Sequence, residues 1–243
     1  NLYKYLFFNH DIQKLYERGL ALTNADYPKQ KHFKEPDKGI AIHLALAFIH
    51  FPEFGFEHDL FKKFWNTKNL KRHKEFISFI GQHSISREAA AEWIKSNKVD
   101  IEKLKKFWDW ALEHCDADEL TGFGFWINTE YGVLDTKWLA QRVRKTLEKT
   151  KGYVEWEYGL MQSLVTFAKK APEETLAILC AHLLEEVAKH EPIRTWLHLY
   201  NEVFDAFKEL YKNKSTKDGV RTLINDLLPY RNGFFWGLKS VLE

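Results

Sequence analysis

The sequence of 243 residues predicts an all-α protein in which short amphipathic helices pair as helical hairpins. Apolar residues recur mostly at spacings of three and four, which is the period of a helix with one buried face. The six prolines lie near breaks in this pattern, as expected where helices end. Few windows alternate with period two; the best of them, 122–134, is short and is expected to form a loop or a helical turn. These observations favour helices over strands throughout the chain.

Twelve helices are expected along the chain. Asp100 is a plausible N-cap for the run Ile101, Leu104, Phe107, Trp108 and Leu112. Pro172 opens another helix, and acidic residues in its first turn suit the positive end of the helix dipole. The expected ranges are 2–22, 38–51, 57–66, 69–82, 86–97, 100–115, 135–149, 156–171, 173–190, 194–213, 216–228 and 233–242.

A dozen helices with mostly short loops favour a solenoid, in which each hairpin buries its apolar face against its neighbours. No exact repeat period is visible, so the array is expected to be irregular and HEAT- or TPR-like, with a compact helical bundle as the alternative. The chain is divided into a slightly basic N-terminal half (1–115), a Gly- and Asp-containing seam (116–134) and a C-terminal repeat half (135–243).

Composition excludes two classes of protein. Hydrophobic residues make up 45% of the chain and aromatic residues 16%, too many for a disordered protein. No stretch is apolar for long enough to span a membrane, so no membrane association is expected. Cys115 and Cys180 cannot form a disulfide framework and are expected to be reduced, which favours a cytoplasmic location. The chain starts at Asn1 and its single methionine is Met161, so we expect a piece of a longer protein.

One basic run is a candidate nucleic-acid interface. Its cations could contact phosphates while its tryptophan stacks on a base. The alternative is a solvated helix face whose Phe64, Trp65 and Leu70 point into the core. The candidate residues are Lys62, Lys63, Trp65, Lys68, Lys71, Arg72 and Lys74.

No metal site or cofactor is expected. His182, Glu186 and His190 are spaced at i, i+4 and i+8 along one predicted helix, and the outer pair would be about 12 Å apart. His43, His50 and His58 lie within sixteen residues, but His43 and His50 are two turns apart and His58 lies beyond Pro52, so we expect scattered histidines on helix faces. No Cys-x-x-Cys or His-Glu-x-x-His spacing is present.

No catalytic residue is predicted either. The sequence has no Walker-type loop and no nucleophile elbow, and Gly122-Phe123-Gly124 lacks the remainder of a dinucleotide fingerprint. His114 and Cys115 are adjacent, and neighbours on a helix point about 100° apart, so they form a poor catalytic pair. Core packing is the expected role of each tryptophan, although at least one of the nine is expected to be an exposed anchor.

The second half resembles a known pattern of core and turn residues. Phe123-Gly-Phe-Trp-Ile-Asn is followed by Tyr131-Gly-Val-Leu-Asp and by a helix carrying Trp138. Lys151-Gly152 and Ala171-Pro172 match two later turns. Val220-Arg-Thr-Leu-Ile-Asn-Asp-Leu and the segment 233–238 match the closing helices. Leu228-Pro229 departs from the pattern, which usually has a glycine-containing turn there.

This pattern is similar to the C-terminal helical-repeat region of large bacterial antiphage defence proteins of the signal-transduction NTPase type. The resemblance covers 123–243 and implies a non-catalytic binding or scaffold module. It would form the sensor or partner-binding part of such a protein, recognising a phage protein or other domains of the parent complex. The resemblance carries over no active-site residue, because the chemistry of the family lies in other domains. A nucleic-acid-binding helical subunit that uses the run 62–74 is the alternative.

Overall fold

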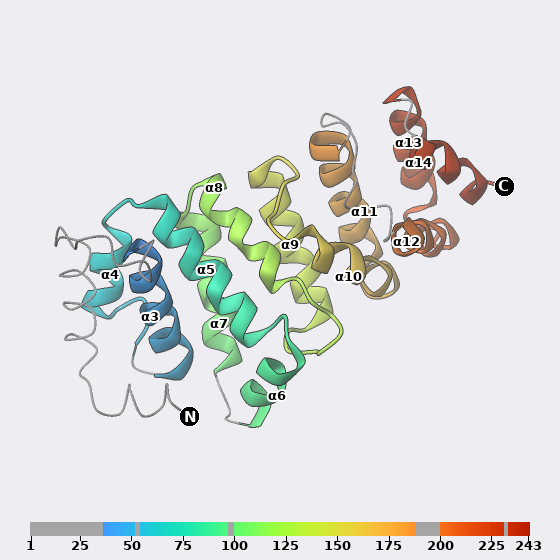
Figure 1. Cartoon of the computed structure of the whole chain (residues 1–243). Helices are drawn as coiled ribbons and strands as arrows, with labels where there is room; N and C mark the ends of the chain where they lie inside the picture. Colours follow the sequence, from blue (N-terminus) through green and yellow to red (C-terminus); the bar gives the residue numbers. More distant parts are fainter. Residues whose placement is uncertain (1–35, 52–53, 97–99, 188–199, 231–232) are drawn as a thin grey trace.

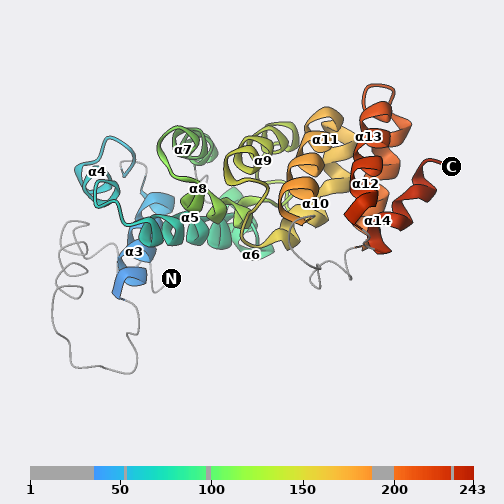
Figure 2. The ribbon, with the colours of Figure 1, turned by 90° about the horizontal axis from the view of Figure 1, so that it is seen from above.

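A computed structural model describes residues 36–51, 54–96, 100–187, 200–230 and 233–243 of the chain (Figure 1). All regular elements in these ranges are helical, which confirms the all-α prediction. The helices form a row, with α3 (Pro36–His50) and α4 at one end and α14 (Gly233–Gly237) at the other. The view from above shows the same row, again with α4 outermost at one end (Figure 2). The most extensive contacts join next-but-one helices, such as α3 with α5 and α10 with α12.

The described helices agree with the expected ranges to within a few residues, apart from those in the last stretches of the chain. After α3, the chain forms α4 (Asp59–Trp65), α5 (Leu70–Ser84), α6 (Glu88–Ser96) and α7 (Ile101–His114). The row continues with α9 (Thr136–Thr150), α10 (Glu157–Lys170) and α11 (Pro172–Cys180). It ends with α12 (Tyr200–Lys212), α13 (Lys217–Leu227), η4 (Leu228–Tyr230), α14 and η5 (Leu238–Val241). The expected helix 2–22 lies outside the described residues.

Two expected helices have a more complex form in the structure. The range 173–190 begins as α11 and continues as the π-helix η2 (Ala181–Val187). The range 233–242 is divided between α14 and η5, a short α-helix and a 3-10 helix. Of the range 194–213, the described part begins with α12. Apolar spacing alone does not distinguish these tighter or wider turns from an α-helix.

Side chains at several helix starts satisfy backbone N–H groups that have no partner inside the helix. The Asp100 carboxylate accepts a hydrogen bond from the Lys103 N–H at 3.0 Å, as the sequence predicts. Asp135 does the same for Trp138 at 2.9 Å, and Asn69 for Arg72 at 3.1 Å. Pro172 occupies the first turn of α11, where a missing N–H costs no helical hydrogen bond. Local sequence therefore fixes where these helices begin.

Aromatic rings fill the core of the first half. The rings of Phe48, Phe76 and Phe107 are fully buried, with centroids 5.2–5.8 Å apart. Phe61 of α4 joins them at 6.0 Å from Phe48. Such pairs add about 0.5–1.5 kcal/mol each beyond the area that they bury. The buried apolar residues then continue without interruption through the second half as far as Val241.

The segment 116–134 contains α8 (Ala117–Leu120) and the 3-10 helix η1 (Thr121–Trp126). The alternating stretch of the sequence thus begins as a helical turn, as expected. With three residues per turn, Phe123 and Trp126 share one face, and both are buried. The indole N–H of Trp126 donates to the Ile77 carbonyl at 2.8 Å, which ties η1 to α5. The division of the chain into two halves at this segment stays a prediction.

Candidate functional site

The basic run lies at the corner between α4 and α5, and several of its cations have partners. Lys62 Nζ lies 2.8 Å from a Glu57 carboxylate oxygen. Lys74 Nζ lies 3.0 Å from Glu155 and 3.4 Å from Asp118. Although partial burial acts in the opposite direction, these two carboxylates raise the pKa of Lys74 overall. Lys63, Lys71 and Arg72 also make interactions, and Lys68 is exposed in the loop with a positive φ of 50°.

Trp65, the aromatic member of the run, packs into the protein. Its ring stacks on His73, with centroids 4.4 Å apart and planes 9° apart, and on Phe61 at 5.2 Å. Phe64 is buried, whereas Leu70 is 37% exposed. Stacking of Trp65 on a base would therefore require the ring to leave these neighbours. Nucleic-acid binding by the run stays a prediction, and charge reversal of Lys71 and Arg72 tests it.

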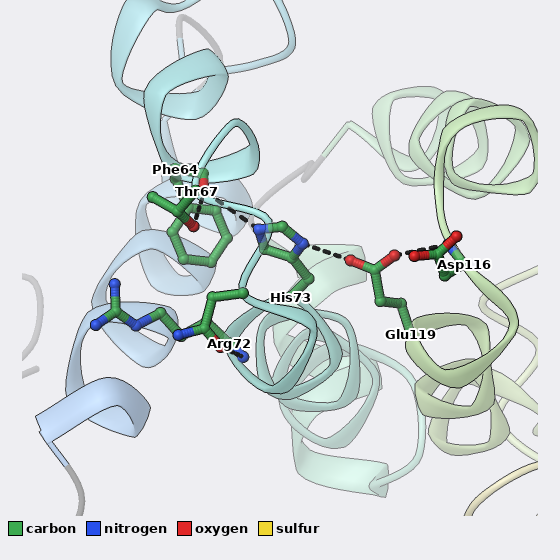
Figure 3. A network of polar contacts seen from close by, with 7 residues as sticks. Phe64, Thr67, Arg72, His73, Asp116 and Glu119 are labelled. Atoms are coloured by element: carbon green, nitrogen blue, oxygen red, sulfur yellow. Dashed lines mark hydrogen bonds and ion pairs between the residues drawn. The ribbon is translucent and has the colours of Figure 1, made fainter.

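A buried polar network lies directly behind this corner (Figure 3). His73 of α5 and Glu119 of α8 point toward each other and form a hydrogen-bonded pair through Nδ1 and Oε1. Both residues are less than 4% exposed. The other imidazole nitrogen of His73, Nε2, lies 3.2 Å from the carbonyl oxygen of Phe64. The second carboxyl oxygen of Glu119 accepts the backbone N–H of Asp116 at 2.6 Å. The network thus joins α4, α5 and α8.

Its geometry determines how many protons the network must hold. Both nitrogens of His73 face oxygen atoms, a carboxyl oxygen and a carbonyl oxygen. Hydrogen bonds at both nitrogens therefore need two protons on the pair, either as imidazolium and carboxylate or as imidazole and carboxylic acid. A buried, fully bonded pair of this kind holds elements together. Because neither residue reaches the surface, the pair is poorly placed to bind or transform a substrate.

The thiols near the core are poorly suited to chemistry. Burial, together with the carboxylates of Glu119 and Asp116, raises the pKa of the Cys115 thiol far above its ordinary value. Burial and Asp226 also raise the pKa of Cys180. A thiol that keeps its proton is a weak nucleophile. Both cysteines are free, and neither is activated for catalysis.

The histidines weighed as metal ligands are dispersed in the described ranges. His43 is exposed on α3, and His58 caps α4 by accepting the Leu60 N–H at 3.2 Å. His182 is buried on η2, where its Nδ1 lies 2.6 Å from the Gly152 carbonyl oxygen. The side chain of Glu186 and all of His190 lie outside the described residues. Within the described part of the chain, no three His, Cys, Asp or Glu residues are placed to hold a metal ion.

An exposed aromatic corner lies where the loop after α9 enters α10. Trp156 is 53% exposed, and the flanking Tyr153 and Tyr158 are 40% and 39% exposed. The Trp156 ring stacks on Phe125 with centroids 5.7 Å apart, and it lies 5.9 Å from Tyr158. Large aromatic side chains of this kind form the energetic centres of many protein interfaces. The corner is therefore the strongest candidate for a binding site on the described surface.

The backbone holds Trp156 in an unusual conformation. Its φ of 58° and ψ of 54° lie in the left-handed region, which is uncommon for a bulky side chain. The cause is the close approach of the preceding residue to η1. A Cβ atom on Gly124 would lie 1.5 Å from the Glu155 carbonyl oxygen, and the Glu155 N–H donates to the Thr121 carbonyl at 2.9 Å. The chain must turn sharply after this contact, and the turn presents the Trp156 ring to solvent.

The expectation of at least one exposed tryptophan is confirmed by Trp156 and by Trp236, which is 57% exposed. Trp108 and Trp126 are fully buried, and Trp65, Trp110 and Trp138 pack partly buried against the core. Trp156 opens the expected helix 156–171, and the sequence pattern predicts no special role for it. The available signal was the cluster of three aromatic residues, Tyr153, Trp156 and Tyr158, within six positions.

Comparison of the chain with protein-family models, curated proteins and solved structures gave no significant match. None of the helices in the described ranges has both the length and the apolar character needed to span a lipid bilayer.

Proposed function

We propose that this chain is a non-catalytic, partner-binding module built on an irregular HEAT- or TPR-like helical solenoid. The observation that carries the proposal is Trp156, a large aromatic residue exposed in a left-handed backbone conformation. That conformation costs roughly 1–2 kcal/mol for a residue with a Cβ atom, and glycine or asparagine would meet the turn at lower cost. The ring stacks on Phe125, and its remaining exposed surface is available for contact with another molecule.

The row of helices supports this role. Successive helices pack on their neighbours, which leaves an extended outer surface for binding. Two polar clusters, the buried His73–Glu119 pair and the ion pairs of Lys74 with Glu155 and Asp118, join separate elements. Such clusters stabilise the packing of one helix against another. The arrangement of these clusters supports a binding surface better than an enclosed active site.

The finer form of the proposal is the sensor or partner-binding part of a bacterial antiphage defence protein in the cytoplasm. Its support is the resemblance of the segment 123–243 to that family. The Phe-Gly-Phe-Trp segment of the shared pattern lies beneath the aromatic corner, where Phe125 stacks on Trp156 and Gly124 makes room for the Glu155 backbone. Two free thiols fit a reducing compartment.

Site-specific cross-linking tests the proposal in cells. A photo-reactive phenylalanine analogue replaces Trp156 in one version of the chain and Trp236 in a control version. We expect a defined cross-linked partner from position 156 and not from position 236. With that partner purified, Trp156→Asn should weaken binding by about tenfold or more, while Trp236→Ala changes it less than about twofold.

Asparagine is the chosen replacement because it tolerates the left-handed conformation. Loss of binding can therefore be separated from loss of folding by measuring the urea unfolding of the same variants. Equal cross-linking from both positions, or a partner insensitive to Trp156→Asn, would contradict the proposal. Failure of every protein in a panel of phage structural proteins to bind would overturn the recognition of a phage structural protein alone.

A further inference from the structure

The helices of the row form two layers that are packed to different extents. In the first layer α7, α9, α11 and α13 contact one another in order, along the upper edge of the row in Figure 2. In the second layer the corresponding order is α3, α5, η1, α10 and α12. The most extensive contacts, α3 with α5, α5 with η1 and α10 with α12, all lie in the second layer, whereas α7 with α9 and α11 with α13 make few. The first layer is therefore loosely packed at those two joints.

An ion pair crosses the joint between α7 and α9. The Arg142 guanidinium of α9 donates two parallel hydrogen bonds to the Asp109 carboxylate of α7, with Nε–Oδ1 and Nη2–Oδ2 distances of 2.5 and 3.0 Å. The same guanidinium lies over the Trp138 ring of its own helix, 5.1 Å from the ring centroid. A forked pair fixes the direction as well as the separation of the two side chains. Arg142 thus holds α9 to α7 in one orientation.

A second ion pair leaves α9 on its other flank. Arg144 Nη1 lies 3.1 Å from Glu174 Oε2 of α11, and its Nε lies 2.7 Å from Glu148 Oε1 of α9. Residues two positions apart on a helix point about 160° away from each other. Arg142 and Arg144 therefore connect α9 to the helix on each side of it. The polar contacts continue at the next joint, where the Ser215 hydroxyl before α13 donates to the Glu173 carboxylate of α11.

The second layer depends mainly on contacts that salt does not screen. The rings of Phe48 and Phe76 join α3 to α5, and the indole N–H of Trp126 joins η1 to α5. The ion pair between Lys74 and Glu155 adds to this packing but does not replace it. In the first layer the side chains of Arg144 and Asp109 are both 43% exposed, so dissolved ions reach both ion pairs. Salt should therefore weaken the first layer more than the second.

We propose that α9 is a salt-dependent hinge of the row, held to α7 by Arg142 and to α11 by Arg144. The screening length falls from about 30 Å at 0.01 M salt to about 3 Å at 1 M. As the two ion pairs weaken, α7, α9 and α11 spread apart while the second layer stays packed. Ion pairs at exposed positions are individually weak, so salt widens the range of separations without unfolding the chain.

Distance measurement between two nitroxide labels on the full chain tests the hinge. The labels are attached to p-acetylphenylalanine in place of the exposed Glu113 of α7 and Asn225 of α13, so both cysteines stay unchanged. We expect the distribution of label separations, measured by double electron–electron resonance, to be about 1.5-fold or more broader at 1 M than at 0.01 M sodium chloride. Equal widths at both salt concentrations would overturn the proposal.

Variants show whether the two ion pairs cause the response. Arg142→Gln with Arg144→Gln should give the broad distribution at both salt concentrations, and so should Asp109→Asn with Glu174→Gln, which removes the partner charges instead. Circular dichroism checks that each variant keeps its helices. The matched control is Lys212→Gln, because Lys212 pairs with Glu209 of its own helix at 2.7 Å and connects no neighbouring helix through that pair. It should keep the response of the unmodified chain.

A variant lacking both arginines that responded to salt as the unmodified chain does would contradict the hinge. Loss of the response in Lys212→Gln would contradict it too, by indicating a general effect of charge. The inference does not depend on the proposed function. A row insensitive to salt would leave the binding role of Trp156 in place, and a partner insensitive to Trp156→Asn would leave the hinge in place.

Discussion

At the scale of single residues, one buried polar pair links three helices. His73 and Glu119 are 46 positions apart, and both are almost completely buried. Removing charges of this kind from water is costly, and the cost is recovered only when every hydrogen-bonding atom has a partner. In this network the Phe64 carbonyl, the imidazole, the carboxyl group and the Asp116 N–H meet that condition. The pair is thus stable as a unit and unstable when one member is removed.

A double-mutant cycle tests this unit. His73→Phe keeps a ring in place but leaves a buried carboxylate without its partner, so we expect the free energy of unfolding to fall by about 3–5 kcal/mol. Adding Glu119→Gln removes the unpaired charge and keeps an acceptor for Asp116. The double variant should therefore be more stable than His73→Phe alone, as measured by urea unfolding. If Glu119→Gln destabilised the His73→Phe protein further, the expected cost of an unpaired buried carboxylate would be contradicted.

His83 illustrates a second residue-scale effect. It lies in the last turn of α5, where a positive charge would favour the helix dipole. Partial burial, assisted by the nearby Arg87, nevertheless lowers its pKa, and the ring stacks on Phe79 at 3.9 Å. The folded state therefore binds its proton less readily than the unfolded state, whose histidine titrates near pH 6.5. The stability contributed by neutral His83 is present above that pH and is lost on acidification.

We expect NMR titration of the imidazole C–H signals to show His83 titrating below pH 6.5, and Arg87→Gln to bring its midpoint closer to the ordinary value. The exposed His114 on α7 provides a second imidazole for comparison in the same spectra. A midpoint for His83 above that of a free histidine would show that the helix dipole outweighs burial.

At the scale of elements, close backbone contacts decide where helices can pack. η1 lies against α5 on one side and against the chain before α10 on the other. Gly81 faces the Phe125 backbone and the Trp126 ring, and Gly124 faces the Glu155 carbonyl. Side chains at these positions would occupy the space of another backbone. The glycines therefore set both the spacing of the helices and the exposed position of Trp156.

Gly124→Ala tests this spacing. A Cβ atom would lie 1.5 Å from the Glu155 carbonyl oxygen, so the loop before α10 must move. We expect the free energy of unfolding to fall by about 3 kcal/mol or more, and the Phe125–Trp156 stacking to be disturbed. Gly55→Ala is the matched control, because its nearest neighbour is a lysine side-chain atom 3.9 Å away, and it should be close to neutral. Equal stability of both variants in urea would refute this account of the contact.

At the scale of the whole molecule, the helical architecture follows largely from local signals. Apolar spacing and caps such as Asp100 and Pro172 act within a few residues, which is why the described helices lie near their expected ranges. The π-helical turns of η2 were not predicted, because a widened turn keeps nearly the same apolar pattern.

The candidate site was much less predictable. The capping residue Glu119 has a local signal, three positions after Asp116, but its pairing with His73 depends on how α8 packs on α5. The exposure of Trp156 depends on the contact between Gly124 and Glu155, which are 31 positions apart. Composition predicted that some tryptophan would be exposed, and only the packing of the helices determines which one.

The order of the helices has a mechanical consequence. Each helix is supported mainly by the helices beside it. A force that pulls on the two ends of the row would therefore be distributed as a small rotation at each contact between neighbouring helices. Trp156 lies at the start of α10 and the segment 128–135 lies between η1 and α9, so they belong to different elements near the middle of the row. A molecule that binds both would fix the relative position of these elements, and the whole row would become harder to bend.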